Sequence, residues 1–274
     1  MMKRLSIALA LLLAGCGQNN DNAWQGYAEG DYAFVSAPLA GWVTSVKVQR
    51  GAWVKNGDLL FTLDDPSQIA ACDSASAAIA QAQGQMAQAE ANLDLAKRQL
   101  VRQQGLLRAN ATSKQAYDLA KSSTDSAAAQ VSQIAAAENQ ARAALDNARY
   151  QLAQREVVSR TTGRVQDVYF RQGEYAPAMP PVVSMLPPKN VYVRFFVPEN
   201  QFAKIHLGDK VKIGCDGCAP DIVATISFIA AQEEFTPPVI FSVGSREKLV
   251  FKVEARAPGG LKLNPGQPVD VRPL

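Results

Sequence analysis

Cysteine and histidine are the residue types in this chain that most directly suggest chemistry, and the chain has only four cysteines and one histidine. Cys215 and Cys218 flank an Asp-Gly pair, a spacing found in redox pairs, zinc half-sites and structural disulfides. A redox pair would place its second cysteine in a helix, whereas Ala-Pro follows Cys218 directly. A zinc site would need two more ligands, and neither Cys72 nor His206 is an obvious candidate. Asp-Gly is typical of a tight hairpin, so we favour a disulfide between Cys215 and Cys218.

No motif for catalysis accompanies these residues. The sequence has no glycine-rich phosphate loop, no nucleophile elbow and no cluster of histidine with carboxylates. The net charge of +3 falls to +1 once Lys3 and Arg4 of the leader are removed, and no basic run is interleaved with aromatic residues. We therefore expect no enzymatic activity, no cofactor, no metal site and no binding to nucleic acid.

The first residues are typical of an exported lipoprotein. Two basic residues precede an apolar run, residues 5–14, that is too short to span a bilayer but suits the core of a signal peptide. Leu-Ala-Gly-Cys then resembles a lipobox, which predicts a signal peptide over residues 1–15 and lipidation of Cys16. The alternative is an ordinary secretory signal with an incidental cysteine. Residues 16–33 are polar and without periodicity, which predicts a flexible tether.

A short glycine and valine pattern occurs twice and predicts a split β-domain. Each copy has the form Gly-x-Val-x-x-Val with a further Gly five residues later, and the copies begin at Gly41 and Gly163. Apolar and polar residues alternate in both copies, as in a half-buried strand, and a glycine turn ends each. Neither half can close a core alone. Residues 34–65 and 156–188 are therefore predicted to form one domain that the residues between them interrupt.

The intervening residues 66–155 carry two heptad series, which predict an antiparallel coiled-coil hairpin. Large residues follow one side of the seam and alanines the other. Glu138 is a polar exception, and Cys72 is expected to act as a small buried hydrophobe. Asp65 and Thr112 are predicted as the N-caps, and arms of about 42 residues would each be roughly 63 Å long. An ordinary helical bundle is the alternative, but its short loops and mixed large core residues are missing.

The remaining residues, 189–274, are predicted to form a small antiparallel barrel. A short helix is expected after the first strand, and turn residues separate the strands, which are expected at residues 190–197, 210–215, 222–230, 249–256 and 268–272. The fold class is thus α+β, with a split β-domain, a long helical hairpin inserted into it, and a barrel.

This combination resembles the HlyD-type membrane fusion proteins, which are the periplasmic adaptors of bacterial tripartite exporters. Leu-Gly-Asp-Lys-Val at residues 207–211 and Leu-Asn-Pro-Gly-Gln-Pro-Val-Asp-Val at residues 263–271 add to the likeness of the split repeat and the insert. The resemblance implies an elongated molecule whose split domain has a lipoyl-like, biotinyl-type fold. It also implies an adaptor that joins an inner-membrane pump to a TolC-type outer-membrane channel, commonly as a hexamer.

The resemblance also suggests how the partners are contacted. The tips of channel-binding adaptors resemble Arg-x3-Leu-x6-Ser, and this chain has Arg102, Leu106 and Ser113 at that spacing. Leu106 lies off the heptad seam, so core packing explains it poorly. The alternative is that Arg102 is a solvated helix residue, Leu106 covers the loop and Ser113 only helps to cap a helix.

Residues 234–240 resemble adaptors of ABC exporters, and the chain ends after the barrel, without the extra β-domain usual beside proton-driven pumps of the resistance-nodulation type. An ABC partner is therefore expected.

Two other classes of protein share parts of this pattern. A lipoyl or biotin carrier would need a modifiable lysine in the turn that the hairpin replaces here, so that class is excluded. A structural coiled-coil lipoprotein of the envelope, without a transport role, would keep the hairpin but would not need the tip residues. For the adaptor, the expected location is the periplasm of a Gram-negative bacterium, with the lipid in the inner membrane. The outer membrane is the alternative, because Gly17 follows the lipidated cysteine in place of the Asp that commonly signals inner-membrane retention.

Overall fold

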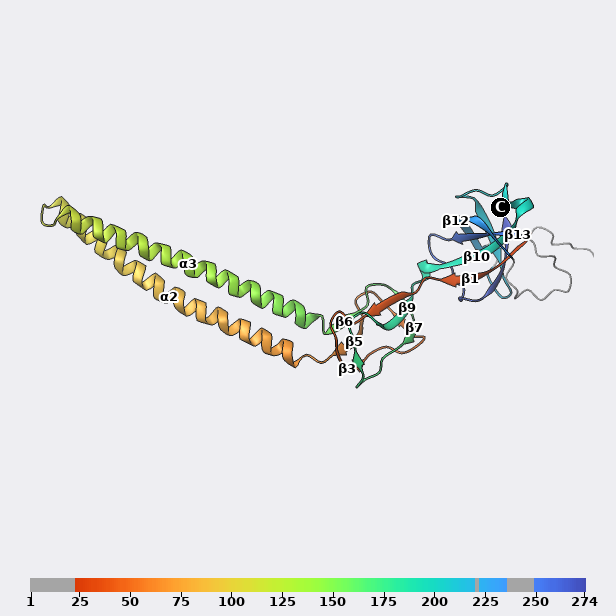
Figure 1. Ribbon diagram of the computed structural model, residues 1–274, viewed down its shortest axis with the longest axis horizontal. Coiled ribbons are helices and arrows are strands. Elements are labelled where there is room, and N and C mark those ends of the chain that lie inside the picture. The colour runs from red at the N-terminus through yellow and green to blue at the C-terminus, as the bar shows by residue number, and fades with distance from the viewer. Residues whose placement is uncertain (1–22, 220–221, 236–248) are drawn as a thin grey trace, which may run out of the picture. The chain divides into compact units, whose positions relative to one another are not determined.

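The computed structural model describes residues 23–219, 222–235 and 249–274, and these residues form a helical hairpin, two four-stranded sheets and a closed six-stranded barrel (Figure 1). The hairpin belongs to one compact unit and the barrel to another. This arrangement of elements confirms the α+β fold class that the sequence predicts.

The hairpin consists of α2 (Pro66–Arg108) and α3 (Lys114–Ala153), which lie side by side (Figure 1). Burial follows the predicted heptads, because the residues of α2 that are withdrawn from solvent recur at alternating spacings of three and four. Ala82, Ala89 and Ala96 are the most buried of them. An alanine at each of these positions lets the partner helix approach closely, so the seam holds the two helices together along their length.

Glu138 is the polar residue in the seam, and its neighbours hold it in place. Arg142 Nη2 donates to Glu138 Oε1 at 2.6 Å, and Gln83 Nε2 of α2 donates to the same oxygen at 3.4 Å. The bond from Arg142, and after it the bond from Gln83, lowers the pKa of the Glu138 carboxyl. Because Gln83 and Glu138 lie on different helices, this pair helps to fix the register of the hairpin.

The two helices begin differently from the predicted caps. Asp65 precedes α2, but its ψ of 2° is not extended and its side chain makes no capping bond. The N-cap of α3 is Ser113, whose Oγ accepts a bond from the N–H of Ala116 at 3.1 Å. Thr112, the predicted cap, instead donates from Oγ1 to Gln103 Oε1 of α2 at 3.0 Å. A hydroxyl caps a helix only where the backbone before the first turn is extended, as it is at Ser113.

The split repeat forms two four-stranded sheets, with orders β2-β9-β7-β4 and β6-β5-β3-β8. Their strands are β2 (Ala33–Ser36), β3 (Gly41–Val46), β4 (Trp53–Val54), β5 (Leu59–Leu63), β6 (Glu156–Val158), β7 (Gly163–Val168), β8 (Tyr175–Ala176) and β9 (Pro181–Leu186). Each sheet takes two strands from before the hairpin and two from after it. Neither half of the repeat could therefore complete either sheet alone.

The two copies of the repeat also share an unusual backbone conformation. The closing glycines, Gly51 and Gly173, have φ angles of 84° and 86°. Six residues further on, the correspondence continues with Gly57 at 93° and Met179 at 95°. A residue with a side chain rarely adopts this region. The Met179 side chain is 85% exposed, so little packing offsets the strain at this position.

We expect Met179→Gly to raise the free energy of unfolding by about 1 kcal/mol, because relief of a strained positive φ outweighs the extra chain entropy that glycine loses on folding. Gly57→Met, at the equivalent position of the first copy, should lower it by a similar amount. Thermal unfolding of both variants measures the two effects. A Met179→Gly protein that melts below the wild type would show that Met179 is not strained.

Six strands close the barrel in the order β1-β10-β13-β12-β11-β14. They are β1 (Trp24–Gly30), β10 (Val191–Pro198), β11 (Lys210–Gly214), β12 (Ile222–Phe235), β13 (Leu249–Arg256) and β14 (Pro268–Pro273), with the short helices η2 (Pro188–Asn190) before β10 and α4 (Glu199–Phe202) after it. Val193, Phe195 and Val271 are fully buried in the core. Trp24 stacks on Phe195 with ring centroids 5.6 Å apart.

The prediction of a flexible tether over residues 16–33 is wrong for its second half, where β1 lies. This strand pairs with β10 on one side and with β14 on the other, so the barrel cannot close without it. Trp24 and Ala28 are buried and Gly26 lies between them in the alternation, but two of these three residues are small. The usual apolar alternation is therefore missing from the sequence, and pairing with distant strands decides the structure.

A network of charged side chains joins β1 to two other strands. Arg194 Nη1 donates to Glu29 Oε1 at 2.6 Å, and its Nη2 donates to Glu254 Oε1 at 3.0 Å. The hydroxyl of Tyr192 donates to Glu29 Oε2 at 2.6 Å. Burial first, and then this bond to Glu29, raise the pKa of Tyr192 well above its usual value. Side chains thus stabilise the same strand pairs that the backbone ladder joins.

Candidate functional site

The tip of the hairpin is the candidate site, and its backbone is well defined. Residues 109–113 connect α2 to α3, and Asn110 adopts the left-handed region with φ of 51°. The N–H of Ala111 donates to the carbonyl of Leu106 at 2.8 Å, and that of Asn110 donates to the carbonyl of Leu107 at 3.0 Å. These bonds cap the last carbonyls of α2 and turn the chain toward α3.

All three predicted contact residues lie at or near this tip and face solvent at least in part. Arg102 is exposed, and it makes no hydrogen bond or ion pair among the described residues. Leu106, one helical turn further, is 38% exposed, whereas its neighbour Leu107 is half-buried in the seam. Ser113 caps α3, as the alternative interpretation proposed, but its hydroxyl hydrogen remains available to a partner. An unpaired guanidinium, an exposed leucine and a hydroxyl are thus presented together.

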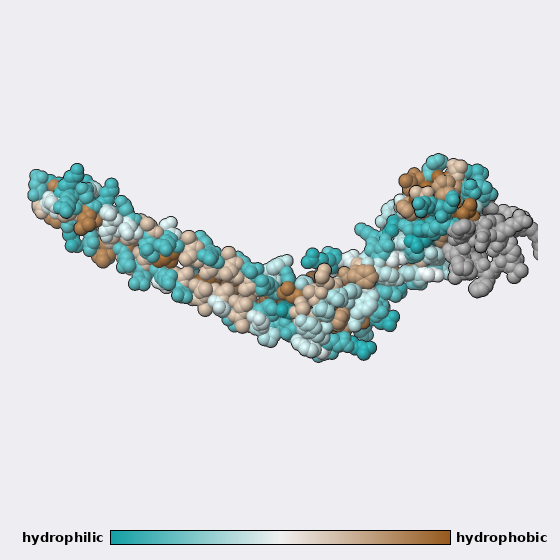
Figure 2. All heavy atoms as spheres, viewed as in Figure 1, coloured by the Kyte–Doolittle hydropathy of each residue, from teal (hydrophilic) through white to brown (hydrophobic). Residues whose placement is uncertain are grey.

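The charge of the tip has one predominant sign. Residues 97–121 include six basic residues and one acidic residue, Asp118. Figure 2 shows that the free end of the hairpin is largely hydrophilic, with small apolar areas between the polar ones. A surface of this kind favours a partner with acidic groups around an apolar contact.

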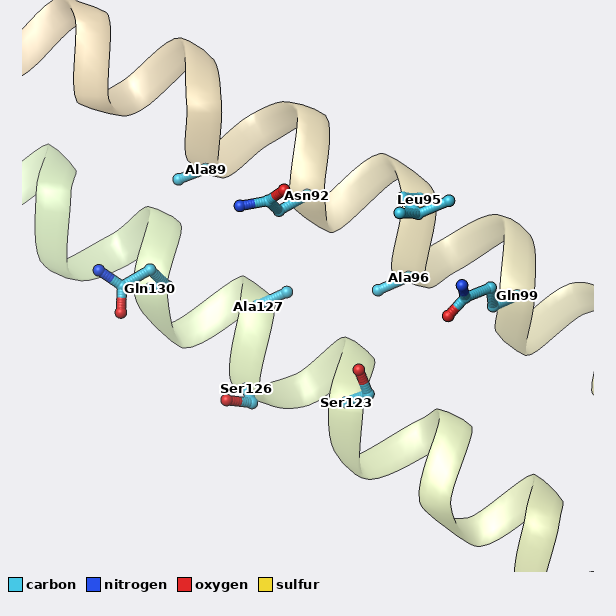
Figure 3. Close-up of a pocket in the computed structure, with 9 residues that line it drawn as sticks. All are labelled: Ala89, Asn92, Leu95, Ala96, Gln99, Ser123, Ser126, Ala127 and Gln130. Atoms are coloured by element: carbon cyan, nitrogen blue, oxygen red, sulfur yellow. The ribbon is translucent and has the colours of Figure 1, made fainter.

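A groove of about 410 Å³ runs between the helices below the tip (Figure 3). Ala89 and Ala96 of α2 and Ala127 of α3 point toward the opposite helix. The remaining lining residues are Asn92, Leu95, Gln99, Ser123, Ser126 and Gln130. None of the nine is charged, so the basic surface of the tip does not continue into this groove.

The structure joins Cys215 and Cys218 by a disulfide, with Cα atoms 5.3 Å apart. The N–H of Cys218 donates to the carbonyl of Cys215 at 3.2 Å, and Gly217 takes the positive φ that the turn requires. Gln267 Nε2 lies 3.4 Å from Cys215 Sγ and 3.5 Å from Cys218 Sγ, a contact that sequence analysis missed because Gln267 is remote in the chain. Among the described residues, no group of histidines, cysteines and carboxylates is placed to hold a metal.

We expect thiol trapping of the periplasmic protein, under denaturing and non-reducing conditions, to label one cysteine, Cys72. The tight turn and an oxidising compartment both favour the bond between Cys215 and Cys218. Cys72 is half-buried in the hairpin seam and has no sulfur partner among the described residues. After reduction, three thiols should be labelled, and three without reduction would contradict the bridge.

The predicted lipidation site, Cys16, lies outside the described residues. In the part of the chain that the structure covers, no helix is long and apolar enough to cross a bilayer.

Comparison with known proteins assigns the hairpin. Residues 78–155 match the family model described as "RND MFP, alpha-helical hairpin domain". The chain is 25% identical to the colistin resistance protein EmrA of Acinetobacter baumannii, over 87% of this chain and 80% of that protein. It is 29% identical over 126 residues to a UPF0194 membrane protein of Acidithiobacillus ferridurans. That match covers 37% of the relative, and another, to a Haemophilus influenzae protein, covers 41%, so the chain spans about two-fifths of these relatives.

Solved structures show the same fold over nearly the whole chain. MacA from Actinobacillus actinomycetemcomitans aligns with a TM-score of 0.72 at 21% identity, over 92% of this chain and 77% of that one. The membrane fusion protein Spr0693 of Streptococcus pneumoniae aligns with a TM-score of 0.59 at 20% identity, over 92% of this chain and 98% of that one.

Residues 78–155 thus match the hairpin domain of a membrane fusion protein, and the chain shares the fold of MacA and Spr0693. The matches to the hairpin model and to EmrA agree with the resemblance to membrane fusion proteins of the HlyD type.

Proposed function

We propose that this chain is the adaptor of a tripartite exporter and links an inner-membrane transporter to a TolC-type outer-membrane channel. The observation that carries the proposal is the tip, where Arg102, Leu106 and Ser113 remain open to a partner while the residues of the seam are withdrawn from solvent. The hairpin itself provides reach, since the 43 residues of α2 give a rod of roughly 65 Å at 1.5 Å per residue.

The experiment that tests this function is cross-linking in the cell. A photoreactive residue at Gln104, next to the tip residues but outside the triplet, should form adducts with a TolC-type channel. The same probe at Asp146, an exposed residue far from the tip in α3, should not. Efflux of dyes and antibiotics should fall when the chain is deleted, and colistin belongs in the panel because one relative is named for colistin resistance. If the probe forms no adducts and deletion causes no efflux defect, the structural lipoprotein is favoured instead.

For the transporter we favour the ABC type over the resistance-nodulation type. The support is the resemblance of residues 234–240 to adaptors of ABC exporters, of which only Glu234 and Phe235 lie within the described residues. The hairpin model is named for RND adaptors, but it covers only residues 78–155. This is the part of the chain that we propose contacts the channel, not the transporter. Affinity purification of the cross-linked adaptor should recover an ABC permease, and recovery of a proton-driven pump alone would reject this preference.

A lipid on Cys16 is the proposed anchor, with the inner membrane as its location. We expect Cys16→Ser to abolish metabolic labelling with a fatty-acid analogue and to leave an unprocessed precursor of higher mass. The physical reason is that the thiol is the acceptor of the lipid, and a hydroxyl does not replace it. Mass spectrometry of the wild-type N-terminus checks the result. An unmodified Cys16 there would reject the anchor, and fractionation of the labelled protein would identify the membrane.

Six copies are the proposed assembly, as the family resemblance implies. An exposed aromatic pair on the split β-domain supports contacts between copies: Trp42 and Tyr175 are 55% and 51% exposed and meet edge to face at 5.4 Å. Large exposed rings at one spot are typical of an interface. Chemical cross-linking should give a ladder that ends at six copies, and Trp42→Asp should shorten it. A ladder that ends at two would reject the hexamer.

A further inference from the structure

The outer wall of the barrel contains a hollow of about 800 Å³, which lies within the size range of small-molecule sites. It lies over β1 and β14, and the disulfide turn after β11 borders it. Its lining residues are Gln25, Gly26, Tyr27, Phe196, Gly214, Cys215, Asp216, Gly266, Pro268, Val269, Asp270 and Arg272. Every one of these residues belongs to the barrel unit. We call this feature the Gly214 hollow.

A missing side chain helps to open the hollow. Lys210 and Lys212 of β11 face outward and Val211 and Ile213 face the core, so the alternation assigns Gly214 to the outside. Gly214 pairs with Asp270 of β14, and a Cβ atom built on it would meet only the Asp270 carbonyl, at 3.8 Å. Any larger residue would extend over this wall without a clash at its Cβ. The space beside Asp270 is therefore open because this position is glycine.

The groups around the hollow are apolar on one side and charged on the other. The rings of Tyr27 and Phe196, both half-buried, lie 6.2 Å apart at an angle of 41° and supply a flat apolar surface. Asp216 comes from the disulfide turn and Asp270 from β14, and neither carboxylate makes a hydrogen bond or ion pair among the described residues. Arg272, also unpaired there, is the single cation among the lining residues and lies across from Lys212.

We propose that the Gly214 hollow binds a small organic cation with a flat apolar body. Two unpaired carboxylates against one guanidinium favour a positive ligand, and a ring or branched body would cover Tyr27 and Phe196. The disulfide between Cys215 and Cys218 fixes the turn that carries Asp216, so one of the two carboxylates is held in position before the ligand arrives. The site is separate from the hairpin tip and does not depend on the adaptor function.

Rhodamine 6G, a flat aromatic cation, is a suitable probe, and fluorescein is its anionic counterpart. The full chain is placed in phosphatidylcholine nanodiscs, and fluorescence anisotropy is measured with the signal of empty nanodiscs subtracted. We expect saturable binding of one rhodamine 6G per chain, which weakens as salt is added, and no saturable binding of fluorescein. Absence of saturable rhodamine 6G binding, or equal binding of fluorescein, would overturn the proposal.

Two variants test the location from different directions. Asp216→Asn with Asp270→Asn removes the charges without changing size and should weaken binding about tenfold, because charged hydrogen bonds are lost. Gly214→Leu keeps the charges and fills the space, and it should weaken binding to a similar extent. Asp94→Asn, which removes an exposed carboxylate from the hairpin, is the matched control and should bind like the wild type. Circular dichroism checks the fold of each variant. Wild-type affinity in either barrel variant would overturn the assignment to this hollow.

Discussion

Arg102→Asp is expected to abolish export while the protein stays folded and keeps its normal level in the membrane. Arg102 is exposed and makes no bond within the described part of the chain, so the change removes nothing that stabilises the hairpin. At a docked tip, the same change would place a carboxylate against the acceptors that the guanidinium contacts. Breaking one desolvated, hydrogen-bonded charge pair typically costs about 2 to 5 kcal/mol of binding free energy. Dye efflux and cross-linking from the tip should both be lost.

The control for this change is Arg149→Asp in α3. Arg149 is also exposed, and it too makes no bond among the described residues, but it lies near the other end of the hairpin from the tip. Efflux should stay normal in this variant. Ser113→Arg is a less clean test, because Ser113 caps α3 and loss of the cap alone costs about 1 kcal/mol. Ser113→Asp keeps a side-chain oxygen that can cap α3, so this variant tests the contact with the channel separately from loss of the cap. Normal efflux with Arg102→Asp would remove the tip from the proposed docking site.

The hairpin could be predicted almost completely from the sequence because its structure is decided by residues close together in the chain. Heptad spacing places the alanines on one side of α2, and the structure buries Ala82, Ala89 and Ala96 as that spacing requires. The helix caps were harder to predict, because a cap depends on a single backbone angle. Asp65 has the right side chain and the wrong ψ, while Ser113 has both.

Two features that sequence analysis missed depend on pairing between distant strands. The strand β1 has too little apolar alternation to be recognised, and only its pairing with β10 and β14 defines it. The Gly214 hollow depends on the register that places Gly214 and Gln25 on either side of Asp270. The strained Met179 could have been found from the sequence, because it stands where the first copy of the repeat has Gly57. That comparison needs the two copies to be aligned beyond their shared motif.

The largest effect on stability is expected from Gly26→Val in β1. A Cβ atom at Gly26 would lie 2.3 Å from the carbonyl oxygen of Arg194 and 2.7 Å from Phe195 Cβ, and the first of these is backbone that cannot rotate away. Either β1 separates from β10 or the barrel distorts. Overpacking usually costs about 1 to 3 kcal/mol, and a clash with backbone should reach about 3 kcal/mol or more. For a chain of this size we expect a melting temperature lower by roughly 10 °C.

Tryptophan fluorescence can assign this loss to the barrel. Trp24 in β1 is 5% exposed, whereas Trp42 and Trp53 are 55% and 58% exposed, so a red shift on melting reports mainly on Trp24. Gly214→Ala is the matched control, because its Cβ would meet only one atom, at 3.8 Å, and it should melt within about 0.5 kcal/mol of the wild type. The hairpin should keep its helicity in both variants, since its seam contains no barrel residue. If Gly26→Val melts like Gly214→Ala, β1 does not close the barrel, and residues 24–30 belong to the tether after all.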